Sequence, residues 1–217
     1  ANRTMTNQIS PTLISPTLNA RTYDDFVVPD SGWTINTLYS NNFVYNSTIT
    51  EAYWEIRQGV VGFNNETAGD VGTLIISGTS SATVTPTGRY SPDDFLQTYP
   101  EQTVAVDVTG QNLFLSDGTY WLSVTPIVLD ANGWVANTVT TGENGTGFNF
   151  GKGFACYIDA NTNQQYADGN YLFDGPIDYS MGIDGTTGGQ VPIPPSILLL
   201  ASGLLALSVH GFRARKR

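Results

Sequence analysis

Asp159, Asn161 and Asn163 place three oxygen-bearing side chains at alternate positions of the stretch DANTNQQYADGN. This is the order of the first three ligands in a helix-loop-helix calcium loop, because hard cations prefer carboxylate and amide oxygens. Gln164 stands where that loop has its turn glycine, and Asn170 stands where it has its closing glutamate. We therefore expect a hairpin loop here, with Ca²⁺ binding as the alternative and no other cofactor.

Glu51 and Glu55 form a second candidate, a carboxylate pair in the stretch TITEAYWEIRQG. Side chains of a strand alternate between its faces, so the two carboxylates would share one face about 13 Å apart. Retaining glycosidases hold their two carboxyl groups only about 5 Å apart. We therefore predict a solvated strand face, with Arg57 as the counter-charge, rather than a hydrolytic site.

Histidine and cysteine chemistry has few residues to draw on. The chain contains one histidine, His210, in an apolar C-terminal stretch, and one cysteine, Cys156. Catalytic triads need a histidine base, and zinc sites need histidine or several cysteines. The sequence therefore predicts a protein that is not an enzyme.

Aromatic side chains are the last class of candidate, since an exposed ring offers a surface on which a sugar can stack. Trp134 is the residue for which we predict such a role, at a strand start. The chain has 4 Trp, 11 Tyr and 10 Phe residues, so most of them are expected to pack in the core or at sheet edges.

Short alternations of apolar and polar residues, separated by Gly, Pro, Asn and Asp, position these candidates. Such alternation predicts strands joined by turns. The face of one strand that carries Ala52, Trp54 and Ile56 should be buried, and Val104, Val106 and Val108 should share one face of another strand. Strands are expected near 33–39, 49–58, 72–77, 103–108, 112–115, 119–125, 134–139, 153–158 and 177–183.

The fold class that follows is all-β, an antiparallel β-sandwich of jelly-roll-like type with a single C-terminal transmembrane helix. Asp117-Gly118 is expected to close a hairpin between strands near 112–115 and 119–125. A short helical turn near 92–96 is the one exception we allow within the body.

Five segments make up the expected organisation of the chain. The tandem repeat ISPTLISPTL favours extended backbone, because each proline biases the residue before it away from the helix. The expected segments are an extended N-terminal arm (1–22), the β-sandwich (23–185), a Gly/Pro linker (186–195), a transmembrane helix (196–212) and a basic cytoplasmic tail (213–217).

Acidic residues dominate the body of the chain. Five basic residues and 19 acidic ones precede the tail, a net charge of -14, and four basic residues in the tail bring the chain to -10. A surface this acidic repels phosphate backbones, so nucleic acid is excluded as a partner.

The C-terminal stretch combines an apolar run with a basic cluster. The run ILLLASGLLALSV, from Ile197 to Val209, is short for a bilayer that needs roughly 20 helical residues, but flanking residues extend it. By the positive-inside rule the basic cluster stays cytoplasmic and the body lies outside, with membrane lipid as a partner. The cluster consists of Arg213, Arg215, Lys216 and Arg217.

Val191, Pro192, Ile193 and Pro194, followed by the apolar run and the RARKR end, resemble the C-terminal sorting signal of PEP-CTERM proteins. In that family the motif usually reads Val-Pro-Glu-Pro, so Ile193 stands where glutamate is expected. The stretches GWTI, YWEIR and TYWLSV resemble a domain common in such proteins. The resemblance implies a bacterial exported protein with a β-rich body and an exosortase-like processing enzyme as a partner.

We therefore expect a non-enzymatic structural protein of the bacterial cell envelope, engaged in adhesion or self-assembly. Its body would lie on the periplasmic or extracellular side, anchored in the cytoplasmic membrane or released to the cell surface or matrix after processing. Two alternatives stay open: an accessory subunit of a membrane complex that retains the tail, and a glycan-binding module.

Overall fold

The computed structural model describes residues 4–6, 19–61, 70, 72–91, 98–130, 133–140, 155–160, 163–168 and 178–188. Regular structure within these ranges is β-strand, apart from one 3-10 turn, η1 (Thr109–Gln111). The described residues include no helix long and apolar enough to cross a membrane. Four predicted features lie outside them: the turn near 92–96, the motif at 191–194, the helix at 196–212 and the basic cluster at 213–217.

The strands form two antiparallel sheets. Their bounds are β1 (Thr4–Thr6), β2 (Asn19–Thr22), β3 (Asp24–Val28), β4 (Trp33–Tyr45), β5 (Ile49–Gln58), β6 (Thr73–Tyr90), β7 (Pro100–Asp107), β8 (Phe114–Leu115), β9 (Gly118–Val128), β10 (Trp134–Thr140), β11 (Ala155–Ala160), β12 (Asn163–Asp168), β13 (Asp178–Tyr179) and β14 (Met181–Thr187). The predicted all-β, antiparallel class is confirmed.

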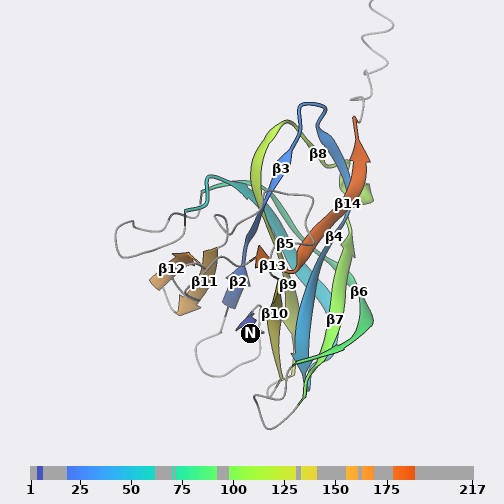
Figure 1. The fold of residues 1–217 in the computed structure, drawn as a ribbon, viewed down its shortest axis with the longest axis vertical. Coiled ribbons are helices and arrows are strands. Elements are labelled where there is room, and N and C mark those ends of the chain that lie inside the picture. The colour runs from blue at the N-terminus through green and yellow to red at the C-terminus, as the bar shows by residue number, and fades with distance from the viewer. Residues whose placement is uncertain are drawn as a thin grey trace, which may run out of the picture.

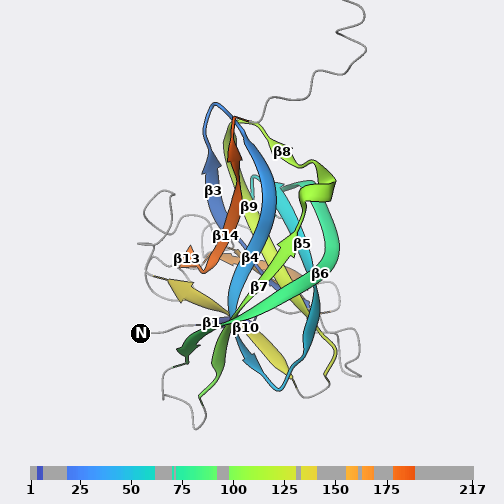
Figure 2. The same ribbon diagram turned by 90° about the vertical axis from the view of Figure 1, so that its right-hand side faces the viewer.

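The larger sheet has the order β1-β10-β4-β7-β6-β5-β9-β3 and folds over into two layers (Figure 1). Strand β6 connects the two layers. Its residues Thr73 to Ser81 pair with β5, whereas Ala82 to Tyr90 pair with β7. Figure 2 shows β6 curving from one layer to the other. One layer therefore contains β10, β4 and β7, and the facing layer contains β5, β9 and β3.

The hydrophobic core lies between the two layers. Trp54 is 1% exposed, and its neighbours on the same face of β5, Ala52 and Ile56, are fully buried, as predicted. Val104 and Val106 of β7 face the same core from the opposite layer. The alternation read from the sequence is therefore confirmed for the strands that build the core.

A buried polar contact also joins the layers. The Ser40 hydroxyl in β4 donates a hydrogen bond to the carbonyl oxygen of Val124 in β9 over 2.9 Å. Asn42 donates to the Ser40 hydroxyl over 2.9 Å. Because buried polar groups stabilise a fold only when they are paired, these contacts fix how the two layers are aligned.

The hairpin predicted around Asp117-Gly118 is wrong. Strand β8 pairs with the start of β4, with Leu115 opposite Trp33, whereas β9 pairs with β5 and β3. The Asp-Gly turn therefore connects two strands that have different partners. Local turn chemistry was correct, but long-range pairing decided which strands became neighbours.

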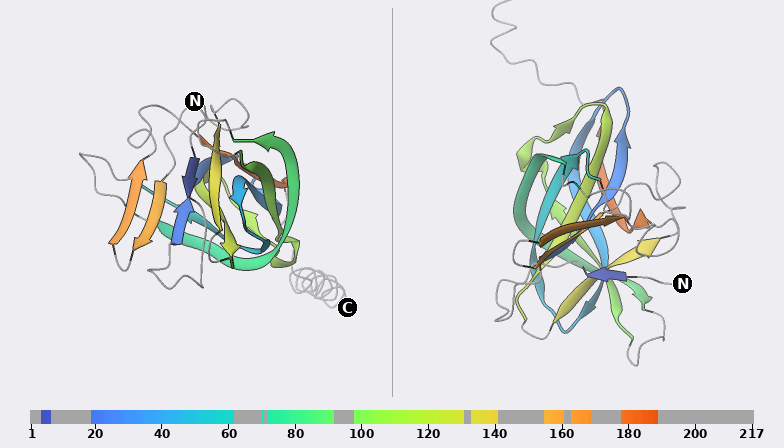
Figure 3. Two further views of the ribbon diagram at one scale, coloured as in Figure 1. Left: turned by 90° about the horizontal axis from the view of Figure 1, so that it is seen from below. Right: turned by 90° about the vertical axis from the view of Figure 1, so that its left-hand side faces the viewer.

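The smaller sheet consists of β12, β11 and β2 and lies beside the larger one (Figure 3). Strand β2 comes from the range expected to be an extended arm, and it pairs with β11. Strand β1, from the same range, pairs with β10. Ala20 and Thr22 of β2 are buried, so part of this range packs against the body.

Gly78 of β6 tests the closeness of the core packing. A Cβ atom at this position would lie 2.7 Å from Cζ2 of the buried Trp54 ring, whereas one at Gly110 would meet nothing within 4 Å. We expect Gly78→Ala to lower the free energy of unfolding by about 1–3 kcal/mol through overpacking. Urea unfolding followed by tryptophan fluorescence measures the loss, with Gly110→Ala as the control. Equal midpoints for the two variants would contradict this packing.

Candidate functional site

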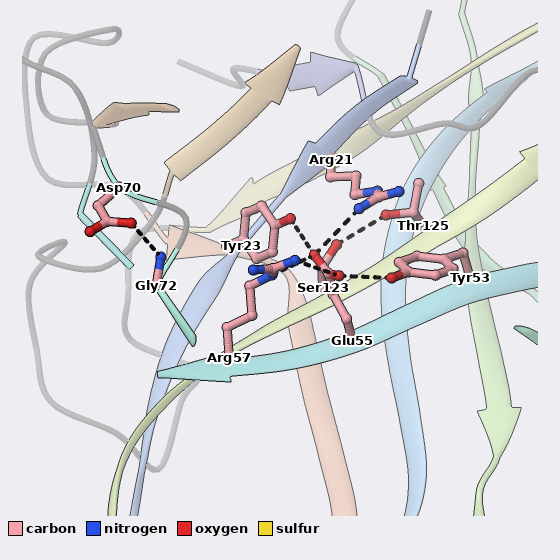
Figure 4. A network of polar contacts seen from close by, with 9 residues as sticks. All are labelled: Arg21, Tyr23, Tyr53, Glu55, Arg57, Asp70, Gly72, Ser123 and Thr125. Carbon is pink, nitrogen blue, oxygen red and sulfur yellow. Dashed lines mark hydrogen bonds and ion pairs between the residues drawn. The ribbon is translucent and has the colours of Figure 1, made fainter. Parts of the chain in front are cut away.

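Glu55 is the most enclosed charged residue of the candidate site. Its residue is 0% exposed, so the prediction of a solvated face is wrong at this position, whereas Glu51 on the same face is exposed as predicted. The difference arises because the chain around β2 covers the outer face of β5 at Glu55. Residues Arg21 and Tyr23 come from that covering segment, as Figure 4 shows.

Both carboxylate oxygens of Glu55 accept hydrogen bonds. Oε1 accepts from the Tyr23 hydroxyl and from Arg57 Nε, the latter over 3.0 Å. Oε2 accepts from the Tyr53 hydroxyl over 2.8 Å and from Arg57 Nη2 over 3.3 Å. Arg21 Nη1 lies 3.6 Å from Oε1, and the Arg21 guanidinium carbon lies 4.3 Å from the centre of the Tyr53 ring.

These contacts decide the charge of Glu55. Burial alone would raise the pKa of this carboxyl, but hydrogen bonds from Arg57 and Tyr23 and the nearby charge of Arg21 lower the pKa below its ordinary value of 4.5. The group is therefore ionised at neutral pH. Because its oxygens already hold their donors, the carboxylate acts as a clamp between two segments of the chain rather than as an acid or base.

Two hydroxyls continue the polar face beside Glu55. Ser123 and Thr125 of β9 are both 0% exposed, and their hydroxyl oxygens lie 3.0 Å apart (Figure 4). Ser123 pairs directly with Glu55, and Thr125 pairs with Tyr53. The outer face of this layer is thus polar and yet covered, which a strand-by-strand interpretation of the sequence could not detect.

Asp24 of β3 is a part-buried carboxyl, and the charged side chains that act on it among the described residues, Asp178 and Asp25, are acidic. Burial, followed by repulsion from Asp178 and Asp25, raises its pKa well above the ordinary value of 3.8, although backbone N–H groups of Tyr179 and Asp25 oppose the shift. Among the described residues there is no group of three or more His, Cys, Asp or Glu side chains placed to hold a metal ion.

The predicted calcium residues fall in a hairpin. Asp159 lies in β11 and Asn163 in β12, and these strands pair with Asp159 opposite Gln164 and Ala160 opposite Asn163. Asn161 lies in the two-residue connection, outside the described residues. The backbone is thus that of the expected hairpin, and Ca²⁺ binding stays a prediction.

Trp134, the predicted stacking residue, belongs to an aromatic cluster at one end of the body. It is the first residue of β10 and pairs with Tyr45, the last residue of β4, with ring centres 6.0 Å apart. The ring of Tyr99 stands edge-on to both, 4.7 Å from Trp134 and 5.4 Å from Tyr45. Of these three rings the sequence indicated only Trp134, since only strand pairing brings them together.

Comparison with protein-family models, with curated proteins and with solved structures finds no match for this chain.

Glu55→Gln tests the clamp. The substitution keeps the shape of the side chain but removes the buried negative charge that Arg21 and Arg57 contact, so we expect a loss of about 3 kcal/mol or more in the free energy of unfolding at pH 7. Because the folded pKa of Glu55 is lowered, its contribution is present above pH 4.5 and disappears as the pH falls through the folded value. The gap between wild type and variant should therefore shrink in acid.

Urea unfolding at a series of pH values measures this gap. Glu51→Gln, on the same face of the same strand but exposed, is the matched control and should leave stability unchanged. A Glu55 variant as stable as the Glu51 variant would rule out the clamp.

Asp24→Asn should have the opposite effect. The folded pKa of Asp24 is raised, so ionisation of this carboxyl opposes folding and its cost grows as the pH rises from 3.8 through the folded value. We expect the asparagine variant to gain melting temperature over wild type between pH 4 and pH 7. Asp184→Asn, at an exposed position of β14, serves as the control, and a gain that does not change with pH would contradict the mechanism.

Proposed function

We propose that this chain is a non-enzymatic protein of the bacterial cell envelope that presents a β-sandwich, of jelly-roll-like type, outside the cytoplasmic membrane. A C-terminal helix holds the body at the membrane until the chain is processed, or permanently if it is not. The work of the body is adhesion or assembly.

The observation that supports this proposal is the division between the body and the C-terminal stretch. Strand residues from Val28 to Val135 fill the core cluster between the two layers. Strand β14 then ends with Thr187 opposite Trp33, and the Gly188 N–H donates to the Gly32 carbonyl over 3.1 Å. Strand β14 ends at the upper end of the body in Figure 2.

Charge divides the chain at the same place. The acidic residues all precede position 185, whereas four of the nine basic residues follow the apolar run at 197–209. This is the charge distribution of a single anchor whose basic end stays in the cytoplasm. The Glu55 clamp supports the non-enzymatic part of the proposal, because this carboxylate has a structural task.

Fractionation of the producing bacterium tests the anchor. We expect the full chain, or its unprocessed fraction, to remain with membranes after alkaline carbonate washing, and a variant ending at Gln190 to be released. The matched control replaces Arg213, Arg215, Lys216 and Arg217 by glutamine and keeps the apolar run. This variant should stay with the membranes but lose its fixed orientation. Protease access to the body measures the orientation.

Intact mass then separates the forms of the proposal. A full-length mature chain in the membrane means a retained anchor, as in an accessory subunit or an anchored surface protein. Loss of everything beyond about residue 195, coupled to release at the surface, means processing by an exosortase-like enzyme. A full-length chain that carbonate extracts into the soluble fraction would overturn the proposal.

A further inference from the structure

The aromatic cluster lies on the same outward face of its layer as the polar side chain of Glu101. Side chains on a strand alternate, so Tyr99, Glu101 and Thr103 lie on the same face along and just before β7. The register places Glu101 opposite Phe43 of β4, one step along from the Tyr45 and Tyr99 rings. The cluster therefore continues into a row of polar side chains on the outer face of this layer.

Glu101 holds an exposed arginine on this face. The Glu101 residue is 4% exposed, and its Oε2 accepts hydrogen bonds from Arg89 Nε and, over 2.7 Å, from the Thr87 hydroxyl. The Arg89 side chain is 62% exposed. Among the described residues, its two terminal nitrogen atoms have no hydrogen-bond partner. The largely exposed guanidinium is thus held at Nε and carries two further donor groups.

Backbone hydrogen bonds and strand pairing hold the rings in place. The backbone of Tyr99 exchanges two contacts with Ser91, since Tyr99 N–H donates to the Ser91 hydroxyl and Ser91 N–H donates to the Tyr99 carbonyl, each over 2.8 Å. Tyr45 and Trp134 are fixed by strand pairing. Tyr45 is 36% exposed, so the cluster reaches solvent rather than the core.

We propose that this surface, the aromatic strip formed by Tyr45, Tyr99, Trp134, Arg89 and Glu101, binds a neutral oligosaccharide. A pyranose presents an apolar face of C–H groups, which packs on aromatic rings, and vicinal hydroxyls, which match the planar fork of an arginine. Fixed rings with a few placed polar groups are what a specific small-ligand site requires.

The charge of the body decides which glycans suit the strip. Arg89 is neutralised by Glu101, and the body carries five basic against 19 acidic residues, so a polyanion would be repelled. Nucleic-acid bases also stack on aromatic rings, but their binding needs a groove of unpaired cations. The inference does not depend on the fate of the C-terminal segment.

Isothermal titration of the full chain against cello-, xylo-, manno- and chito-hexasaccharides tests the strip. The chain is kept in a polyoxyethylene detergent, because detergents with sugar headgroups would compete for the site. We expect at least one neutral hexasaccharide to bind with a dissociation constant below about 1 mM. Trp134→Ala should weaken that binding about tenfold or more, as truncation of a central aromatic does at a binding site.

Three variants separate binding from structure. Trp134→Phe keeps a ring and should retain most of the affinity. Arg89→Lys keeps a positive charge beside the buried Glu101 and so should keep the fold, but it loses the planar fork and should weaken binding. Phe114→Ala removes another exposed ring, on β8 beside the start of β4, and should bind as wild type does. Circular dichroism checks that each variant is folded.

The proposal is overturned if none of the four hexasaccharides binds. It is equally overturned if Phe114→Ala weakens binding as much as Trp134→Ala does. Tight binding of an alginate hexamer in place of the neutral sugars would refute the charge argument and with it the neutral class of ligand.

Discussion

The buried carboxylate of Glu55 is the constraint on which the arrangement of the whole body depends. A charge taken out of water destabilises a fold by several kcal/mol unless partners surround it. Here the partners come from β5 itself, through Tyr53 and Arg57, and from the N-terminal segment, through Arg21 and Tyr23. The body cannot keep Glu55 buried without keeping that segment in place, so the two are coupled.

The bend of β6 couples the two layers of the larger sheet. By pairing first with β5 and then with β7, this strand joins the two layers through one continuous backbone. The layers therefore close over Trp54 without a separate connection. The end of β4 pairs with the starts of β7 and β10, and the aromatic strip forms where these strands meet.

The body thus has a structural charge network on one outer face and an aromatic strip on the other. The first is saturated, with donors on both oxygens of its carboxylate, and so it is suited to holding the fold together. The second presents a half-exposed set of rings and a largely exposed arginine, and so it is suited to contact with a ligand. A body that recognises a sugar from a membrane anchor would act in adhesion, which joins the two proposals without making either depend on the other.

Alternation along single strands was sufficient to predict the all-β class, the strand at 49–58 and the burial of Trp54, because side chains point to opposite faces whatever the partner. The division of charge along the chain and the apolar run were also evident from the order of residues in the sequence. Strand pairing was not: no local pattern indicated that β8 would join β4, that β6 would continue to Tyr90, or that the chain around β2 would cover Glu55. These features depend on contacts between residues far apart in the chain, whose energy no local pattern records, and so only the tertiary structure decided them.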